Sequence, residues 1–323
     1  MKVLSWNCRG LGSPRAVRAL LRLTRLENPD VLFIMESRLK QEEAQSIKYR
    51  CGFDSGISVD CRGEGRSRAG GLILLWRNII QLKIMSYSAN HIGGAIVDVV
   101  DNQDWFFHGV YGYPEETNKQ HTWQLIQDLI TRSGDRVIIF GDLNDTLYEH
   151  EKAGGNPRSS AQLSMGRQTM DICGLSDLGF QGHPYTWTNG RQGDNNIQCR
   201  LDRAIASQSF LNRFSPHKVS HLPRFGSDHA VLKIELEVDL GSKGRRRVHL
   251  FRFEEAWSKD KKCEDSVREV WNSAPGSGVS KIAGLQRIED HFKEYRISGL
   301  KKELRRIEDL LNNDSNWDGS EEA

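Results

Sequence analysis

The sequence predicts an α/β fold in which two mixed β-sheets pack face to face and helices cover their outer sides. Short apolar runs recur along the chain, each long enough for a buried strand. Helix-length segments separate the early and late runs, whereas hairpin-length segments such as 101–104 separate the middle ones, so both parallel and antiparallel pairing are expected. With 323 residues, 37% of them hydrophobic, the chain is long enough to fill such a core.

Seven apolar runs are expected to form the strands. They are residues 3–6, 31–35, 71–76, 95–100, 105–112, 137–141 and 231–238. The segment 13–30 between the first two runs predicts a helix, because Ser13 and Pro14 stand at the N-cap and first-turn positions that these residue types favour.

The composition changes near residue 240, where the stretch DLGSKGRRRV mixes Gly, Lys and Arg in a way that is typical of a linker. We therefore expect a main domain at 1–238 and an extension at 239–323. Within the extension, residues 300–311 carry leucine and isoleucine at helical spacing and predict an exposed amphipathic helix. The acidic tail 313–323 is predicted to be disordered.

Composition excludes several classes of protein. The 45 Lys and Arg against 43 Asp and Glu give a net charge of +2, which argues neither for nor against a polyanionic partner, although residues 1–40 have a local excess of basic side chains. The 6 cysteines form no CxxC pair, so a zinc ribbon and a disulfide scaffold are disfavoured. We find no signal peptide and no apolar run of membrane-spanning length, which predicts an intracellular protein without a membrane partner.

Polar side chains stand at the ends of the predicted strands, where α/β proteins usually bind their ligands. Taken one at a time, each has an ordinary explanation: Asn and Asp form turns or helix caps after strands, and a Tyr is often a core aromatic. Taken together, they include the residue types needed to hydrolyse a phosphodiester with a hard metal ion. They are Asn7, Glu36, Tyr111, Asp142, Asn144, Asp202, Ser227, Asp228 and His229.

Each chemical role in that hydrolysis has a candidate. Mg²⁺ prefers oxygen ligands and keeps several waters, so a carboxylate and an amide oxygen suffice to hold it. Glu36 and Asn7, with Asp228, are the candidate ligands.

The remaining roles concern the water and the phosphate. Asp142 and Asn144 are expected to orient and deprotonate the attacking water. His229, held cationic by Asp202, is expected to stabilise the negative charge of the transition state, and Tyr111 adds a hydrogen-bond donor.

The ordered blocks SWNCRG, MES, GVYGYP, GDLN, RLDRA and SDH resemble the endonuclease/exonuclease/phosphatase superfamily, which includes the exonuclease III type abasic-site nucleases and pancreatic deoxyribonuclease. The resemblance spans roughly residues 1–238 and implies a four-layer α/β sandwich. The sequence between the blocks, such as CGLSDLGFQGHPYTWTNGR, most resembles the endonuclease domain of plant LINE-type, non-LTR retrotransposon proteins. The phrase FRFEEAW also resembles the segment directly after the nuclease in those proteins.

Carried over motif by motif, the resemblance implies the same roles and places Tyr111 and His229 on the scissile phosphate. It adds Thr186 of YTW as a phosphate or minor-groove contact, and it places Asp228 as a partner of the metal or of the histidine. The chain departs from LINE proteins in one respect, because the aromatic-Ala-Asp-Asp motif of reverse transcriptase is absent. Any role in integration would therefore need a reverse transcriptase or a retroelement ribonucleoprotein supplied by another chain.

The substrate must be argued separately, since related sites hydrolyse many phosphoesters. Basic side chains in the helix 13–30, together with Arg62, Arg66 and Arg68 in the loop CRGEGRSRAG, are expected to contact a DNA backbone, with a solvated helix face and a flexible loop as the alternative. Trp187 is expected to pack inward from a β-hairpin. The basic run in GSKGRRRVHLF is consistent with a nuclear signal or a phosphate clamp.

The leading hypothesis is a Mg²⁺-dependent DNA endonuclease of retrotransposon origin that nicks its substrate, with Mn²⁺ as a substitute metal. One alternative is a cellular abasic-site repair nuclease. A second alternative, of a different class, is a catalytically idle, domesticated remnant that binds nucleic acid or a protein partner.

Overall fold

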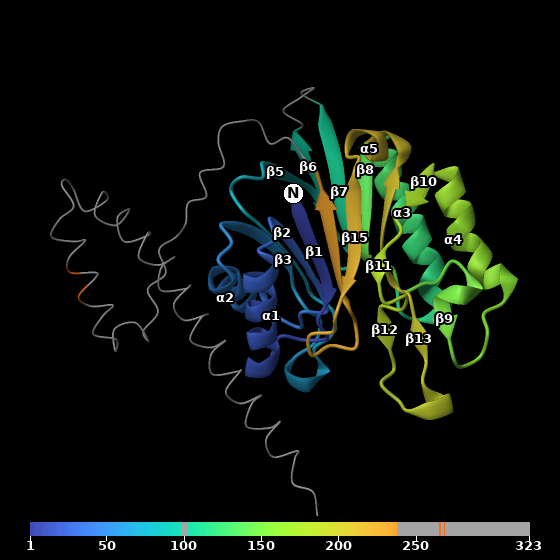
Figure 1. Ribbon diagram of the computed structural model, residues 1–323, viewed down its shortest axis with the longest axis horizontal. Coiled ribbons are helices and arrows are strands. Elements are labelled where there is room, and N and C mark those ends of the chain that lie inside the picture. The colour runs from blue at the N-terminus through green and yellow to red at the C-terminus, as the bar shows by residue number, and fades with distance from the viewer. Residues whose placement is uncertain (98–102, 238–264, 266–267, 269–323) are drawn as a thin grey trace, which may run out of the picture. The chain divides into compact units, whose positions relative to one another are not determined.

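The structure is a computed structural model that describes residues 1–97, 103–237, 265 and 268. The described fold lies within one compact unit, Met1–Lys243, and contains two large mixed sheets and a small third one (Figure 1). The seven-stranded sheet runs in the order β11 (Gln181–Gly182), β15 (His217–Leu222), β16 (Val231–Leu236), β1 (Lys2–Asn7), β2 (Val31–Met35), β4 (Leu72–Trp76) and β3 (Ser55–Val59).

The second large sheet has six strands. Its order is β10 (Leu175–Asp177), β14 (Asp202–Ser207), β8 (Val137–Asp142), β7 (Asp104–Tyr111), β6 (His91–Val97) and β5 (Leu82–Tyr87). A three-stranded sheet joins β12 (Trp187–Thr188), β13 (Gln198–Cys199) and β9 (Lys152–Ala153). The α-helices are α1 (Pro14–Glu27), α2 (Gln41–Cys51), α3 (Lys119–Ser133), α4 (Ser160–Ile172) and α5 (Gln208–Arg213).

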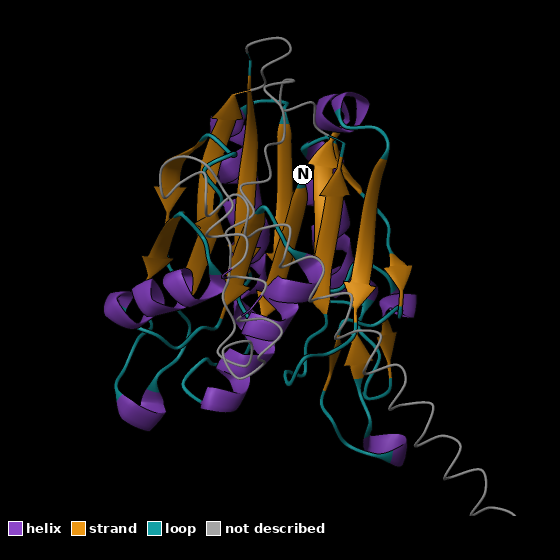
Figure 2. Ribbon diagram, turned by 60° about the vertical axis from the view of Figure 1, so that its left-hand side comes forward, coloured by secondary structure: helices purple, strands orange, loops and turns teal. Residues whose placement is uncertain are grey.

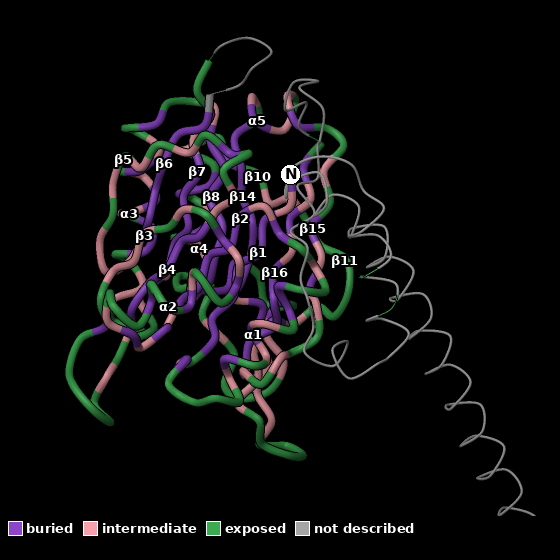
Figure 3. The backbone as a smooth tube through the Cα atoms, turned by 90° about the vertical axis from the view of Figure 1, so that its left-hand side faces the viewer, coloured by how far each residue is buried: buried purple, intermediate pink, exposed green. Residues whose placement is uncertain are grey.

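Three hydrophobic clusters join these elements into four layers. In β1, Val3 packs into the cluster between the two large sheets, whereas Leu4 and Trp6 pack into a second cluster that also contains Val17 and Leu20 of α1. A third cluster joins the outer side of the six-stranded sheet to α3 and α4. Figure 2 shows the strands side by side with helices outside them, and Figure 3 shows that the central strands are buried along most of their length. The predicted α/β fold of two mixed sheets flanked by helices is confirmed.

The strand predictions are accurate in place and approximate in length. The run 31–35 is β2 as predicted, and 105–112 and 137–141 correspond to β7 and β8 with shifts of one residue. The strand predicted at 95–100 begins earlier, at His91, and its residues 98–100 lie outside the described residues, as do residues 101 and 102 of the connection 101–104.

Helix α1 has the start that the sequence predicts. The Ser13 hydroxyl accepts a hydrogen bond from the backbone N–H of Ala16, and Pro14 is the first helical residue. The helix ends at Glu27 and is capped by Asn28, whose backbone is left-handed with φ 47° and whose N–H donates to the Thr24 carbonyl.

Predictions for the C-terminal region fall beyond the part of the chain that the structure describes. They comprise the boundary near 240, the amphipathic helix at 300–311 and the disordered tail at 313–323, and they stay predictions. Among the described helices, none combines the length and the apolar character needed to cross a lipid bilayer.

Candidate active site

One rim of the two large sheets collects the polar residues that the sequence singles out. Strands β1 and β2 are parallel, so Asn7 at the end of β1 and Glu36 directly after β2 lie at the same rim. Strands β7 and β8 are also parallel, and their register sets Tyr111 beside Asp142 at their ends.

Two antiparallel strands bring the remaining residues to the same place. Strand β14 runs against β8 and begins with Asp202 opposite Asp142. Strand β16 runs against β1 and begins two residues after His229. Because antiparallel partners start where the others end, residues up to 222 positions apart in the sequence meet at one rim.

A buried row of three ionisable groups forms the centre of the site. The Nδ1 atom of His229 lies 2.9 Å from Oδ2 of Asp202, and its Nε2 atom lies 3.6 Å from Oδ2 of Asp142. Both carboxylates are fully buried and His229 is 4% exposed. The longer distance exceeds hydrogen-bond range, so Nε2 of His229 remains available as a donor to a ligand.

The electrostatics of this row suit a cationic histidine beside a basic carboxylate. Burial lowers the pKa of His229, but the carboxylates of Asp202 and Asp142 outweigh burial and raise that pKa to about 9. Burial raises the pKa of Asp142 to about 6, with Asp202 adding to the rise and His229 opposing it. Near neutral pH, His229 is therefore protonated while Asp142 is ionised and has a pKa close to that of an effective general base.

Asn7 links this row to Glu36. Its amide nitrogen donates to Oε1 of Glu36 and to Oδ2 of Asp142, each at 2.9 Å. The Tyr111 hydroxyl donates to the same Oε1 of Glu36 at 3.0 Å. Burial and the Glu36 carboxylate raise the pKa of Tyr111, so its hydroxyl stays protonated and acts as a donor.

A divalent metal fits the oxygen donors at Glu36. Among the described residues, the nearest cation to Oε2 of Glu36 is Arg38 at 3.6 Å, which leaves that oxygen without a hydrogen-bond partner. The Asn7 oxygen accepts from the N–H of Arg9 at 3.2 Å, so ligation through this oxygen requires the amide to turn over. Glu36 is therefore the better anchor, and Asn7 is the second donor.

The atoms of Asp142, Asp202 and His229 also lie within 4.8 Å of one another, close enough to hold a metal ion. That alternative is a poorer fit, because a metal binds neutral imidazole whereas the two carboxylates hold His229 protonated. One observation favours it, since Oδ1 of Asp202 is buried with no hydrogen-bond partner among the described residues. The row is therefore suited to acid–base chemistry, and Glu36 is the residue that could hold a metal.

Asp228 lies at the edge of the site, and two side chains bind its Oδ2 atom. Arg9 forms an ion pair with its Oδ2 atom, and Nε1 of Trp187 donates to the same atom at 2.9 Å. The backbone of Trp187 also forms an isolated β-bridge with His229. Trp187 was predicted to pack inward from a hairpin, but it is half-buried and lines the cleft; the sequence gives no signal for this bridge.

Hydrogen bonds of both its backbone and its side chain hold Asn144 in place. Its N–H donates to Oδ1 of Asp142 at 2.9 Å, and its side-chain amide donates to the Gly112 carbonyl at 2.9 Å. Its carbonyl accepts from Nζ of Lys119 at 2.8 Å. Asn144 and Asp142 are therefore positioned as one unit.

Unfavourable backbone conformations concentrate at this rim. Five described residues other than glycine have a positive φ, and four of them, Arg9, Glu36, Arg38 and Asn144, lie here with φ between 50° and 55°. Gly141 has φ +142°, and a Cβ atom there would lie 2.0 Å from the Val110 carbonyl oxygen. Strained backbone conformations cost stability, so proteins retain them mainly where they serve a function. Here they fix the directions of the side chains at the rim.

A cleft with room of about 400 Å³ opens over these groups. Asn144 and His229 lie in its lining, directly above the buried Asp142. Arg9, Lys119 and Lys152 also line the cleft, together with Glu36, Pro114, Trp187, Ile197, Cys199, Leu201 and Asp228. The ion pairs of Arg9 with Asp228, and of Lys119 with Glu116 and Asp145, offset part of this positive charge, and the remainder suits an anionic substrate.

The residues predicted to contact the substrate differ in exposure. Thr186 is 1% exposed, and its hydroxyl accepts from the N–H groups of Leu201 at 2.9 Å and Asp202 at 3.0 Å, which fixes the start of β14. Its contact with a substrate stays a prediction. Arg62 and Arg66 are exposed, in a loop whose Cys61 N–H donates to the Leu39 carbonyl near Glu36.

Arg68 differs from its two neighbours in that loop. Its Nη1 atom pairs with Glu43 at 2.8 Å and also donates to the Arg38 carbonyl at 3.3 Å. The Glu43 carboxylate therefore offsets its charge before any substrate binds.

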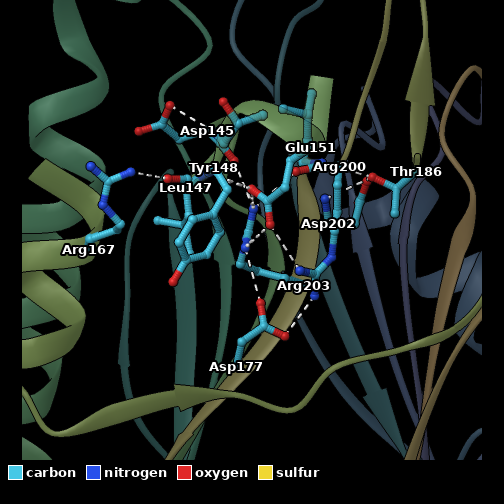
Figure 4. A network of polar contacts seen from close by, with 12 residues as sticks. Asp145, Leu147, Tyr148, Glu151, Arg167, Asp177, Thr186, Arg200, Asp202 and Arg203 are labelled. Atoms are coloured by element: carbon cyan, nitrogen blue, oxygen red, sulfur yellow. Dashed lines mark hydrogen bonds and ion pairs between the residues drawn. The ribbon is translucent and has the colours of Figure 1, made fainter. Parts of the chain in front are cut away.

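A buried ion network supports the site from behind (Figure 4). Arg203, adjacent to Asp202 and fully buried, pairs with Glu151 at 2.8 Å and with Asp177 at 3.1 Å. Glu151 also accepts from the N–H of Leu147 at 2.6 Å, in the loop that follows Asn144. The network thus connects the start of β14 to the loop after β8. It was not predicted from the sequence.

Comparison with known proteins places the chain in a known family. Residues 4–229 match the model of the endonuclease/exonuclease/phosphatase family. No curated protein matches the chain.

Several solved structures share the fold. The endonuclease domain of TRAS1, a telomere-specific non-LTR retrotransposon, matches with 17% identity and a TM-score of 0.54 over 73% of this chain and 98% of that chain. The 3′ phosphatase NExo from Neisseria, bound to product DNA hairpin, matches with 19% identity and a TM-score of 0.53 over 73% and 99%. AP endonuclease LMAP from Leishmania major matches with 18% identity and a TM-score of 0.56 over 72% and 86%.

Proposed function

This chain belongs to the endonuclease/exonuclease/phosphatase family, and from that premise we propose that it is a divalent-metal-dependent endonuclease that nicks DNA. We further propose that it derives from a plant LINE-type, non-LTR retrotransposon. The observation that carries the proposal is the buried row of Asp142, His229 and Asp202 beside Glu36 at one rim. Members of the family are hydrolytic nucleases and phosphatases that use divalent metals.

The proposed reaction is hydrolysis of one phosphodiester bond. A water oxygen forms a bond to phosphorus, the bond from phosphorus to the leaving oxygen breaks, and the water proton passes to the Asp142 carboxylate. Asn144 orients the water. The protonated His229, held by Asp202, and the Tyr111 hydroxyl donate to the non-bridging phosphate oxygens as negative charge increases there, while solvent supplies the proton for the leaving oxygen.

Glu36 would hold the metal, with Asn7 as the second protein ligand and water as the remaining ligands. When bound, the metal supplies positive charge against the phosphate oxygens. The choice between Mg²⁺ and Mn²⁺ belongs to the proposal, and Mg²⁺ is its first candidate.

DNA as the substrate is supported by the basic residues that line the cleft and by the exposed Arg62 and Arg66, whose loop is hydrogen-bonded to the segment that follows Glu36. The retrotransposon origin is supported by the resemblance of the sequence blocks and by the fold shared with the TRAS1 domain. A nuclear location and a reverse transcriptase or ribonucleoprotein partner on another chain belong to the same proposal. The basic run GSKGRRRVHLF, on which the nuclear expectation depends, lies outside the described residues.

Nicking of supercoiled plasmid tests the proposal. The purified full chain should convert supercoiled to open-circular plasmid with Mg²⁺ and not with EDTA. Asp142→Ala and His229→Ala should each lower the rate by about 10²- to 10⁴-fold, because each removes a group that moves a proton or balances charge. Equal nicking by the wild type and both variants would identify a contaminating nuclease.

Two further measurements separate the alternatives. A strong preference for an abasic duplex over an undamaged one would assign the protein to abasic-site repair. Binding of nucleic acid without turnover at any metal concentration would identify the catalytically idle remnant.

A further inference from the structure

Helix α1 exposes a column of arginines. Arg15, Arg18, Arg22 and Arg25 are all exposed, and their spacing of three and four residues sets them on one face of the helix. The helix has a single acidic residue, Glu27, which is half-buried at its last position and pairs with Lys233 at 3.3 Å. The outer face of α1 therefore presents four cations and no fully exposed carboxylate, with the exposed Leu26 beside them near its end.

This arrangement costs folding stability. Arg15 and Arg18 lie at the N-terminal end of α1, where the helix dipole is positive and disfavours cations, and there is no acidic residue in the first turn. Like charges three and four residues apart also repel each other, by roughly 0.2–0.5 kcal/mol per pair. No carboxylate among the described residues pairs with any of the four arginines, so nothing in the described fold offsets these costs.

The column extends away from the proposed active site. Helix α1 begins just after β1 ends at the rim, whereas its last turn lies beside the start of β1, since Lys2 Nζ donates to the Glu27 carbonyl. Arg25 is ten residues beyond Arg15 and so lies about 15 Å further from the rim. Arg22 and Arg25 therefore lie further than Arg15 from the residues proposed to hold the phosphate that is cut.

We propose that the outer face of α1 binds the phosphate backbone of a second nucleic-acid segment, separate from the segment that is cut. The inference rests on the proposed function for the class of ligand. The column is about 15 Å long, which is enough to follow several phosphates of one strand, whose rise along the duplex axis is about 3.4 Å per phosphate. Four positively charged side chains along this length match such a row of negative phosphates.

The opposite side of α1 excludes a lipid surface as the partner. Val17, Leu20 and Leu23 are buried against the seven-stranded sheet. A helix that lies on a membrane needs its apolar side free to enter the lipid, and here the fold occupies that side.

Binding in EDTA tests the inference without catalysis. The probes are a 20-nucleotide single-stranded RNA and a 20-base-pair DNA duplex, with fluorescence anisotropy followed over a series of KCl concentrations. The test variant of the full chain carries Gln in place of Arg15, Arg18, Arg22 and Arg25.

The matched control carries Gln in place of Arg50, Lys83, Arg132 and Lys218, which are exposed cations on other elements. Both sets of changes lower the formal net charge from +2 to −2.

We expect the α1 variant to bind at least about tenfold more weakly at 0.1 M salt, with a salt slope shallower by about 3, as loss of four phosphate contacts predicts. The control should stay within about twofold of the wild type, because loss of non-contacting charges releases no counterions. A smaller variant, Arg22→Gln with Arg25→Gln, should show about half the change in slope and guards against misfolding of the larger one.

The two probes show which nucleic acid the outer face of α1 binds. A loss of affinity confined to the RNA probe would identify an RNA strand, and an equal loss for both probes would show that the face binds the phosphate backbone of RNA and DNA alike. Equal weakening by the α1 variant and the control would overturn the inference. So would competition by polyglutamate as strong as that by nucleic acid, because the surface would then be a general site for acidic polymers. Failure of plasmid nicking with a persistent α1 effect would sink the proposed activity alone.

Discussion

Replacing Asp202 by asparagine tests how the fold holds a proton on His229. The side chain keeps its shape but loses the charge that lies 2.9 Å from Nδ1 of His229. Burial lowers the pKa of His229, and Asp202 is the largest of the influences that raise it to about 9. Without Asp202, the pKa of His229 must fall.

The magnitude depends on the pH of the assay. With its pKa at about 9, roughly nine in ten molecules hold the His229 proton at pH 8. If the variant returns to the reference pKa of about 6.5, only about 3% do, which is a loss of roughly 30-fold. At pH 6 the same calculation gives a loss of less than about 1.5-fold.

Initial rates of plasmid nicking in saturating Mg²⁺ measure this effect between pH 6 and pH 8. The wild-type rate should rise as Asp142 ionises through about pH 6 and fall as His229 loses its proton through about pH 9. The ratio of wild-type to Asp202→Asn rates should increase with pH, on top of any constant loss from misorienting the ring. Asp171→Asn, an exposed change of the same kind on α4, should leave the ratio at one. A ratio for Asp202→Asn that does not change with pH would refute the reasoning.

Three other changes test separate parts of the structure. Glu36→Gln should raise the Mg²⁺ concentration needed for half-maximal nicking at least about tenfold, and an unchanged Mg²⁺ titration would remove Glu36 from the metal site. Arg203→Met leaves Arg200 as the remaining cation beside Glu151 and Asp177 among the described residues, and should lower the free energy of unfolding in urea by about 1–3 kcal/mol, whereas the exposed Arg191→Met should change it by less than about 0.5 kcal/mol. Gly141→Ala should destabilise more than Gly134→Ala, because both have a positive φ but only the first Cβ would meet backbone, at 2.0 Å; equal midpoints would contradict this.

Most of the strands that the sequence predicts are buried on both faces, although β16 was predicted despite half-exposed Lys233 and Glu235, and the fully buried β14 was missed. Strand β2 is apolar at every position because it lies between two hydrophobic clusters, so its run is unmistakable. Strands β3, β5 and β15 have polar residues on one side, and their Ser, Lys and His side chains interrupt the apolar pattern. They were missed for that reason.

The residues of the candidate site were predictable as far as their chemistry depends on position at strand ends. Trp187 and Arg9 could not be foreseen around Asp228, because their contacts join segments 41 and 219 residues away. Arg68 resembles a free cation in the sequence, and only the fold brings Glu43 of α2 to it. Arg203 was missed because a basic residue after Asp202 gives no sign that burial will pair it with Glu151.

The central claim is that Asp142, His229 and a metal at Glu36 act as one hydrolytic site. The most direct measurement is the single-turnover nicking rate of the wild type, the two single alanine variants at Asp142 and His229, and the double variant, in Mg²⁺. We predict that the double variant is no slower than the slower single variant, since each group needs the other. Additive losses, or nicking that persists in EDTA, would contradict the claim.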